Sequence, residues 1–124
     1  MIAYATLGTN DMNRAIAFYD LVLGAIGGRR EETSPEWTRY GREGERPKLC
    51  LTTPFDKAKA TFGNGAMLAF ETRGHASVDA FHAAALAQGG TDEGQPGLRE
   101  GTHYVAYVRD PDGNKLCVFA PKDL

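Results

Sequence analysis

The chain has 124 residues, the length of a single domain, and its 14 lysines and arginines against 16 aspartates and glutamates leave a net charge of −2. That charge argues against a nucleic-acid-binding protein, whose affinity comes largely from basic groups on phosphates. With 42% hydrophobic residues and 15 glycines, the composition is that of a globular domain and excludes disordered and collagen-like chains.

The amino-terminal stretch MIAYATLGTN has neither the basic nor the apolar region of a signal peptide, and no apolar run reaches the ~20 residues of a membrane span. The two cysteines, Cys50 and Cys117, are too few for a disulfide framework. We therefore expect a protein of the reducing cytoplasm, with no membrane or nucleic-acid partner.

The first half of the chain predicts a strand, a helix and three further strands. Residues 4–9 alternate as a short strand. Asp11 is a candidate N-cap for a helix that Gly27 and Gly28 end. Its apolar stripe comprises Ala15, Phe18, Tyr19, Val22 and Leu23. Strands are expected near 29–33, where the signal is poor, and at 37–41 and 48–52.

The second half repeats the first. A shift of 63 positions places Leu7 on Phe70, Thr9 on Thr72, Phe18 on Phe81 and Leu23 on Leu86. After an insertion the shift becomes 67 and places Trp37 on Tyr104, Arg42 on Arg109 and Lys48-Leu49-Cys50 on Lys115-Leu116-Cys117. Such ordered matches indicate an internal repeat.

The repeat predicts an α+β fold: one domain, 1–124, of two tandem βαβββ modules, 1–52 and 66–121, joined by a linker at 53–65. Strands are expected at 67–72, weakly at 91–93, and at 103–109 and 115–120. The second helix has the stripe Val78, Phe81, Ala85 and Leu86 and a weaker cap near Gly74. The last two strands form a hairpin around Asp110-Pro111-Asp112-Gly113, which has good turn chemistry.

Each module has one helix to cover one sheet face, so the strands are expected to form a curved mixed sheet around a ligand groove. Alternation assigns to the helix side Ala5, Leu7, Leu49, Leu51, Leu68, Phe70, Leu116 and Val118. It assigns to the groove Tyr4, Thr6, Lys48, Cys50, Met67, Ala69, Glu71, Lys115, Cys117 and Phe119. Trp37, His103 and Tyr104 are added as residues that could reach or stack on a ligand.

The stretches LGTNDMNRAIAFYD, PFDKAKATFGNGAMLAF, AFHAAALAQGGTDEG and YVRDPDGNKL resemble the vicinal oxygen chelate superfamily. More narrowly, the chain is similar to glyoxalase/bleomycin resistance/dioxygenase proteins over nearly its whole length. The resemblance implies paired βαβββ modules, often in a homodimer, and in catalytic members a divalent metal in the groove. One class of members binds drugs without metal.

Family metal ligands stand on the first and last strands of each module, usually His or Gln on the first and Glu on the last. The matching positions here are Tyr4, Cys50, Met67 and Cys117. Because hard divalent cations prefer oxygen and imidazole ligands, we expect no metal cofactor of the usual kind.

The remaining candidates have alternative interpretations. Cys50 and Cys117 could be buried apolar residues, a soft metal site with Met67, a disulfide or reactive thiols. His103 could touch ligand, whereas His82 fits a half-exposed packing role and His75 lies near a helix start. Glu71 could be a general base or a solvated strand-end charge that pairs with Lys48 or Lys115.

Three functions follow as hypotheses. The first is a protein that sequesters a small amphipathic ligand in the groove, oriented by Glu71, His103 or a lysine. The second is an enzyme of the same superfamily, similar to lactoylglutathione lyase or a dioxygenase, with displaced or no metal. The third is a structural or interaction module whose groove is filled by its own side chains. The sequence leaves open the ligand, and whether one chain or two close the groove.

Overall fold

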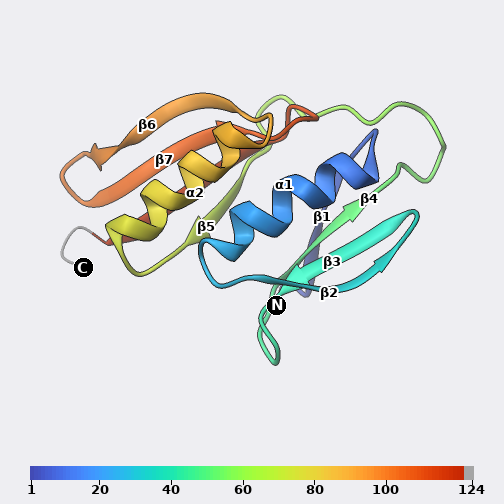
Figure 1. The fold of residues 1–124 in the computed structure, drawn as a ribbon, viewed down its shortest axis with the longest axis horizontal. Helices are drawn as coiled ribbons and strands as arrows, with labels where there is room; N and C mark the ends of the chain where they lie inside the picture. Colours follow the sequence, from blue (N-terminus) through green and yellow to red (C-terminus); the bar gives the residue numbers. More distant parts are fainter. Residues whose placement is uncertain (122–124) are drawn as a thin grey trace.

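The computed structural model describes residues 1–121, which form two four-stranded sheets with one helix each (Figure 1). The first half contains β1 (Tyr4–Gly8), α1 (Met12–Gly24), β2 (Arg29–Ser34), β3 (Trp37–Gly41) and β4 (Lys48–Thr52). The second contains β5 (Leu68–Glu71), α2 (His75–Ala87), β6 (Thr91–Arg99), β7 (His103–Arg109) and β8 (Lys115–Pro121). Within these residues no helix has the length and apolarity needed to cross a membrane.

The two sheets have the same strand order, β1-β4-β3-β2 and β5-β8-β7-β6, which confirms the repeated βαβββ unit. In each, the first and last strands of the module pair in parallel and the remaining pairs are antiparallel. Each module thus contributes one four-stranded mixed sheet, as expected of an α+β fold of two tandem modules. The two halves are linked by α1 and α2, which pack against each other and share one apolar core (Figure 1).

Helix α1 forms as its sequence predicts. The Asp11 carboxylate accepts a hydrogen bond from the backbone N–H of Arg14 and caps the helix, and the buried positions are the five of the predicted stripe. Helix α2 differs in two respects. Its N-cap is Gly74, which offers no side-chain hydrogen bond, and its buried set contains His82 where Leu86 was expected. Leu86 is exposed.

His82 is buried because it has a partner. Its Nε2 lies 2.8 Å from Oδ1 of Asp92, at the start of β6. The hydrogen bond from His82 lowers the pKa of the Asp92 carboxyl from its usual range. The half-exposed packing role expected for His82 is therefore wrong: the residue is 4% exposed, and its hydrogen bond to Asp92 joins α2 to β6.

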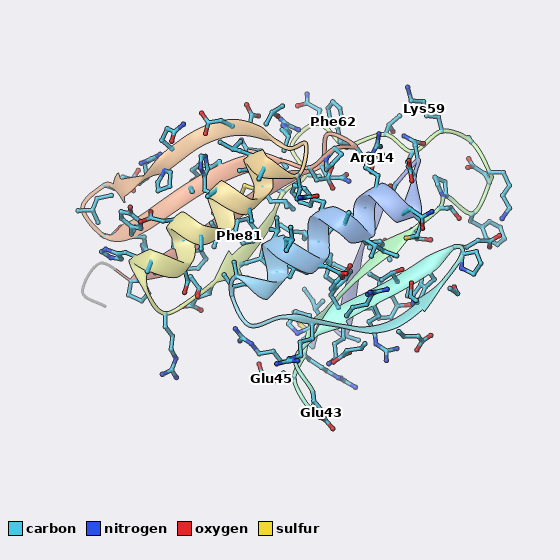
Figure 2. The ribbon with its side chains drawn as sticks, viewed as in Figure 1. Arg14, Glu43, Glu45, Lys59, Phe62 and Phe81 are labelled. Carbon is cyan, nitrogen blue, oxygen red and sulfur yellow. The ribbon has the colours of Figure 1, made fainter. Side chains whose placement is uncertain are left out.

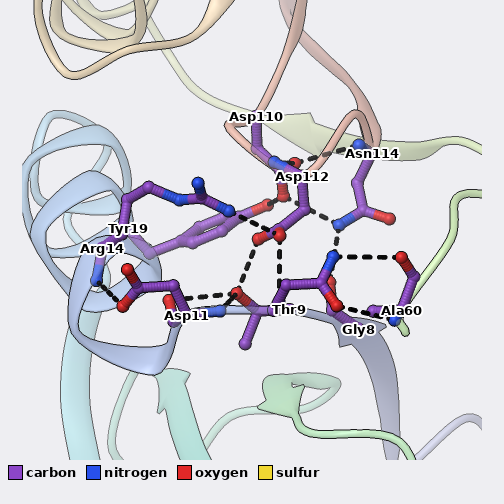
Figure 3. A network of polar contacts seen from close by, with 10 residues as sticks. Gly8, Thr9, Asp11, Arg14, Tyr19, Ala60, Asp110, Asp112 and Asn114 are labelled. Carbon is purple, nitrogen blue, oxygen red and sulfur yellow. Dashed lines mark hydrogen bonds and ion pairs between the residues drawn. The ribbon is translucent and has the colours of Figure 1, made fainter. Parts of the chain in front are cut away.

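A turn from the second module clasps the first module (Figure 3). Asp110 organises this turn, because its carboxylate accepts hydrogen bonds from the backbone N–H groups of Asp112 and Asn114 and from the Asn114 amide. The Asp110 carboxylate also accepts a hydrogen bond from the hydroxyl of Tyr19, which lies on α1. Burial raises the pKa of the Asp110 carboxyl. Burial also raises the pKa of the Tyr19 hydroxyl, and the neighbouring Asp110 carboxylate raises it further.

The carboxylate of Asp112 binds the junction between β1 and α1. It accepts hydrogen bonds from the Thr9 hydroxyl at 2.6 Å, the Asn10 backbone N–H at 2.9 Å and the Arg14 guanidinium at 2.7 Å. Only 3% of the Asp112 side chain is exposed. The Asn114 amide also donates to the Gly8 carbonyl at 3.0 Å. We call residues 110–114 and these partners the clasp.

We predict that Asp112→Asn lowers the free energy of unfolding by about 1–3 kcal/mol, because a buried charged acceptor of three donors is lost. Chemical denaturation measures this change. The matched control is Glu45→Gln at the repeat-equivalent position, where the exposed carboxylate forms only a 3.7 Å ion pair with Arg42. The control should shift stability by less than about 0.5 kcal/mol. Equal effects of the two variants would contradict a structural role for the clasp.

Candidate functional site

Each sheet has one face covered by its helix and one face turned away from it. The strand register places the predicted side chains on these faces as the alternation requires. The first open face carries Tyr4, Thr6, Trp37, Arg39, Lys48 and Cys50. The second open face carries Ala69, Glu71, His103, Lys115, Cys117 and Phe119, and Met67 directly precedes its first strand.

The first open face joins aromatic groups to charged groups. The rings of Tyr4 and Trp37 meet edge to face with centroids 5.9 Å apart. Beside them, the Glu31 carboxylate forms ion pairs with the Lys48 ammonium at 2.8 Å and with the Arg39 guanidinium at 3.2 Å. The hydrogen bond from Lys48, followed by that from Arg39, lowers the pKa of Glu31. These contacts hold Lys48 and Arg39 in place on the face.

A cavity of about 700 Å³ opens on the first open face. Its lining includes Tyr4 and the basic residues Arg29, Arg30, Arg39, Arg46 and Lys48, against the acidic residues Glu31 and Glu43. The excess of basic groups gives it a positive potential that favours an anionic ligand. We call this cavity the open-face cavity. Its volume lies within the range of about 300–1,000 Å³ typical of small-molecule sites.

On the second open face the charges are arranged differently from the prediction. His103 is exposed and meets the Phe119 ring edge to face at 5.4 Å. The Lys115 ammonium lies over the Tyr107 ring, 5.5 Å from its centroid. Within residues 1–121, the ion pair of Lys48 is with Glu31 and not with Glu71. The suggested pairing of Glu71 with Lys48 or Lys115 is therefore wrong for the part of the chain described.

Tyr104 lies on the opposite side of its sheet from His103. It pairs with Ala120, which is fully buried in the core, and its hydroxyl donates to the Asp79 carboxylate of α2 at 2.6 Å. Its ring stacks on His75 with centroids 4.2 Å apart. This placement corrects the assignment of Tyr104 to the groove, because adjacent residues of a strand point to opposite faces.

A second and larger cavity, of about 1,210 Å³, lies between the two modules. We call it the inter-module cleft. It runs from the end of α1 and the loop between β3 and β4 to β5 and the start of α2. Of the predicted groove residues the open-face cavity includes Tyr4 and Lys48, and the inter-module cleft includes Lys48, Ala69 and Glu71. The predicted groove set is thus divided between two sheets.

A protein-family model described as the glyoxalase/bleomycin resistance protein/dioxygenase superfamily matches residues 1–118. The chain belongs to this superfamily. A lactoylglutathione lyase of Salmonella typhimurium is 30% identical over 135 aligned residues, which cover 98% of this chain and 93% of that protein.

Two solved structures extend the comparison. A glyoxalase/bleomycin resistance protein from Albidiferax ferrireducens is 38% identical, with a TM-score of 0.89 over 97% of this chain and 98% of that one. TnmS3, an antibiotic-binding protein from Streptomyces, is 21% identical with a TM-score of 0.69, over 98% of this chain and 95% of its own. The latter likeness shows the shared fold alone.

The superfamily's metal ligands provide a test of this chain's donor set. Tyr4, Cys50, Met67 and Cys117 supply a phenol, two thiols and a thioether where the resemblance implies imidazole, amide and carboxylate groups. Burial raises the pKa of both thiols, so they stay protonated at neutral pH. Within residues 1–121, no three His, Cys, Asp or Glu side chains lie together as a metal-binding group. These residues do not fit a hard divalent cation.

Both cysteines are free and buried, 1% exposed for Cys50 and 5% for Cys117, and they lie in the central strands of different sheets. This placement agrees with the interpretation of buried apolar side chains and not with a disulfide within the chain. Sequence reasoning missed the charged residues around Cys50, chiefly Glu31 and Arg39. The signal was present, since Arg39 shares the parity of Trp37 and the run RREE precedes it.

We predict that neither thiol reacts appreciably with iodoacetamide in the folded protein at pH 7.5, because each is buried and its pKa is raised. Mass spectrometry after timed labelling measures the modified fraction of each cysteine. The same reaction in denaturant is the control and should modify both. Fast labelling of Cys50 or Cys117 in the folded state would instead indicate a reactive thiol.

Proposed function

We propose that this superfamily member is a binding protein for a small amphipathic molecule with an anionic group, held on the first open face. The observation that carries the proposal is the replacement of the four implied metal ligands by Tyr4, Cys50, Met67 and Cys117. The fold of the superfamily is retained here, but the residues at the metal-ligand positions are of other types. This combination favours a protein that binds a ligand without metal-dependent turnover.

The first open face, which holds the open-face cavity, supports this proposal with both kinds of contact that such a ligand needs. The rings of Tyr4 and Trp37 offer an aromatic edge for the apolar body. Arg39 and Lys48, positioned by Glu31, offer charge-assisted hydrogen bonds to an anionic group. A cavity of about 700 Å³ also argues against the third hypothesis, a module whose groove is filled by its own side chains.

An enzyme of the lactoylglutathione lyase type is the second candidate. It is favoured by the 30% identity to that enzyme across 98% of this chain. Its chemistry would have to come from groups other than the four replaced ligands, and Glu71 remains the candidate base because it is an exposed carboxylate lining the inter-module cleft.

Assays of metal content and turnover separate the two candidates. Elemental analysis and native mass spectrometry of untagged protein should find no stoichiometric nickel, zinc, iron or manganese. The hemithioacetal of methylglyoxal and glutathione, and catechols, should not be turned over with or without added divalent metal. A metal near one equivalent would contradict the metal-free binding protein, and turnover above that of a Glu71→Gln variant would establish the enzyme.

We also propose that two copies of the chain form a homodimer that completes the groove. The first strand of each module, β1 and β5, stands at the free edge of its sheet. The large side chains of Ile2, Tyr4 and Met67 are exposed beside these edges. Exposed apolar side chains that lie together often mark a protein–protein interface. The mass in the same native spectra tests the dimer, and a monomer at all concentrations would contradict it.

We predict that the dye 8-anilinonaphthalene-1-sulfonate, an aromatic body with an anionic group, binds the first open face. Binding is measured by the quenching of the fluorescence of Trp37, the only tryptophan in the sequence. Arg39→Gln should weaken the affinity by about three- to tenfold, because a charged partner on the face is lost. Arg99→Gln on β6, where the guanidinium bonds the Gln95 carbonyl, is the matched control and should leave the affinity unchanged. Equal affinities of both variants would contradict the assignment.

A further inference from the structure

The basic side chains of the open-face cavity come from separate parts of the first module. Arg29 begins β2, Arg39 lies in β3, Arg46 lies on the loop between β3 and β4, and Lys48 begins β4. Like charges that the fold brings together repel one another, so such a cluster is an unfavourable arrangement without an anion. The cavity is therefore the place in the first module where the charge of a ligand can be specified.

Gly41 allows a lysine to cross the floor of this cavity. Gly41 of β3 is the register partner of Arg29 in β2. A Cβ at Gly41 would lie 2.5 Å from Cδ and 3.1 Å from Nζ of Lys48, so the lysine side chain extends over this position. Its ammonium reaches the Glu31 carboxylate on β2 at 2.8 Å and the Arg42 carbonyl at 2.7 Å. An ammonium has three N–H donors, so one remains for a ligand.

Three of the five basic lining residues have acidic partners. Arg39 and Lys48 share the carboxylate of Glu31, Arg39 also pairs with Glu32, and Arg30 pairs with Asp20 at 3.2 Å. These ion pairs hold the side chains in place and offset most of their charge. The charge that remains for a ligand must come from the other two basic residues of the lining.

Those two residues are Arg29 and Arg46. Both are exposed, and within residues 1–121 neither forms an ion pair. The second acidic residue of the lining, Glu43, lies on the same loop as Arg46. Figure 2 shows Glu43 directed away from the body of the molecule. The cavity thus offers two guanidinium groups whose charge is not offset by a neighbouring carboxylate.

Two guanidinium groups and an ammonium are better matched by a phosphate than by a carboxylate or sulfonate. The planar donors of arginine fit the oxygens of a phosphate in pairs, and such charge-assisted hydrogen bonds are strong. A phosphate monoester has three terminal oxygens and carries close to two negative charges at neutral pH. A carboxylate or a sulfonate carries one charge and leaves one of the two guanidinium groups uncompensated.

We propose that the anionic group of the ligand is a phosphate monoester, bound by Arg29 and Arg46 beside the Lys48 ammonium. The apolar part of the ligand lies toward Tyr4, the aromatic residue of the cavity lining. Gly41 then sets the position of Lys48 and is a positioning residue. This inference rests on the function proposed above, because it names the class of ligand for the same cavity.

Phenyl phosphate and phenyl sulfate test the charge of the ligand. They share the ring and the tetrahedral group, but at pH 8 the phosphate carries about two negative charges and the sulfate one. Isothermal titration of the intact chain at low salt should give an affinity about tenfold or more higher for phenyl phosphate. Equal affinities of the two, with 8-anilinonaphthalene-1-sulfonate still bound, would overturn the phosphate and leave the proposed function. No binding of any of the three would overturn both.

Two arginine variants locate the phosphate. Arg29→Gln and Arg46→Gln each remove an exposed guanidinium without an ion pair and should weaken phenyl phosphate binding by about three- to tenfold. Arg73→Gln, an exposed arginine of the inter-module cleft, is the matched control and should leave the affinity unchanged. Unchanged affinity in both cavity variants, or a loss in Arg73→Gln alone, would overturn the site.

Gly41→Ala tests the position of Lys48 without removing any charge. The new methyl group should displace the lysine side chain from β3 and weaken phenyl phosphate binding several-fold. Gly24→Ala is the matched control, because a Cβ at Gly24 meets no atom within 4 Å, and it should bind phenyl phosphate as the unmodified chain does. Equal affinities of the two glycine variants would overturn the assignment of Lys48 to the site.

Discussion

The carboxylate of Asp112 is held against the start of a helix that belongs to the other half of the chain, and this contact fixes how the two modules meet. Asp110 shapes the turn that presents it, and the turn needs Gly113 in the left-handed region, at φ +91°. Gly90 makes a second contact possible, since a Cβ there would lie 2.9 Å from the Phe18 ring of α1 and closer still to two backbone carbonyls. The helices can share one core because these two contacts set their distance.

The linker between the two modules also contacts both of them. The Asn10 side chain both donates to and accepts from the backbone of Ala60, and the Arg109 guanidinium lies 5.2 Å from the centroid of the Phe62 ring. One end of the module interface is therefore closed by the clasp and the linker. At the other end the inter-module cleft remains, so the repeat in the sequence becomes an asymmetric molecule.

The sequence predicted what depends on local pattern. The stripe of α1, its Asp11 cap and the parity of β1, β4, β5 and β8 follow from spacing alone, and the structure confirms them. Strand β2 gave a poor signal because all six residues are exposed, and β6 because its pairing shifts around Gly94. Tyr104 was misplaced although alternation with His103 should have excluded one of them. The cavities could not be predicted, since they arise where two modules meet, and the pairing of Arg39 with Glu31 depends on a β-bulge in β2.

The stretch YVRDPDGNKL is one of the four that carry the resemblance, and the structure shows what it does in this molecule. Its two aspartates join module to module, and the closest of the implied metal-ligand positions is Cys117, on the strand beyond the turn. A motif of this kind therefore indicates how the two modules are joined and not which reaction or ligand the protein has. Matches that rest on such a stretch therefore report the shared arrangement of the two modules, and sorting the matched proteins by activity requires comparison of the strand positions that face away from the helices.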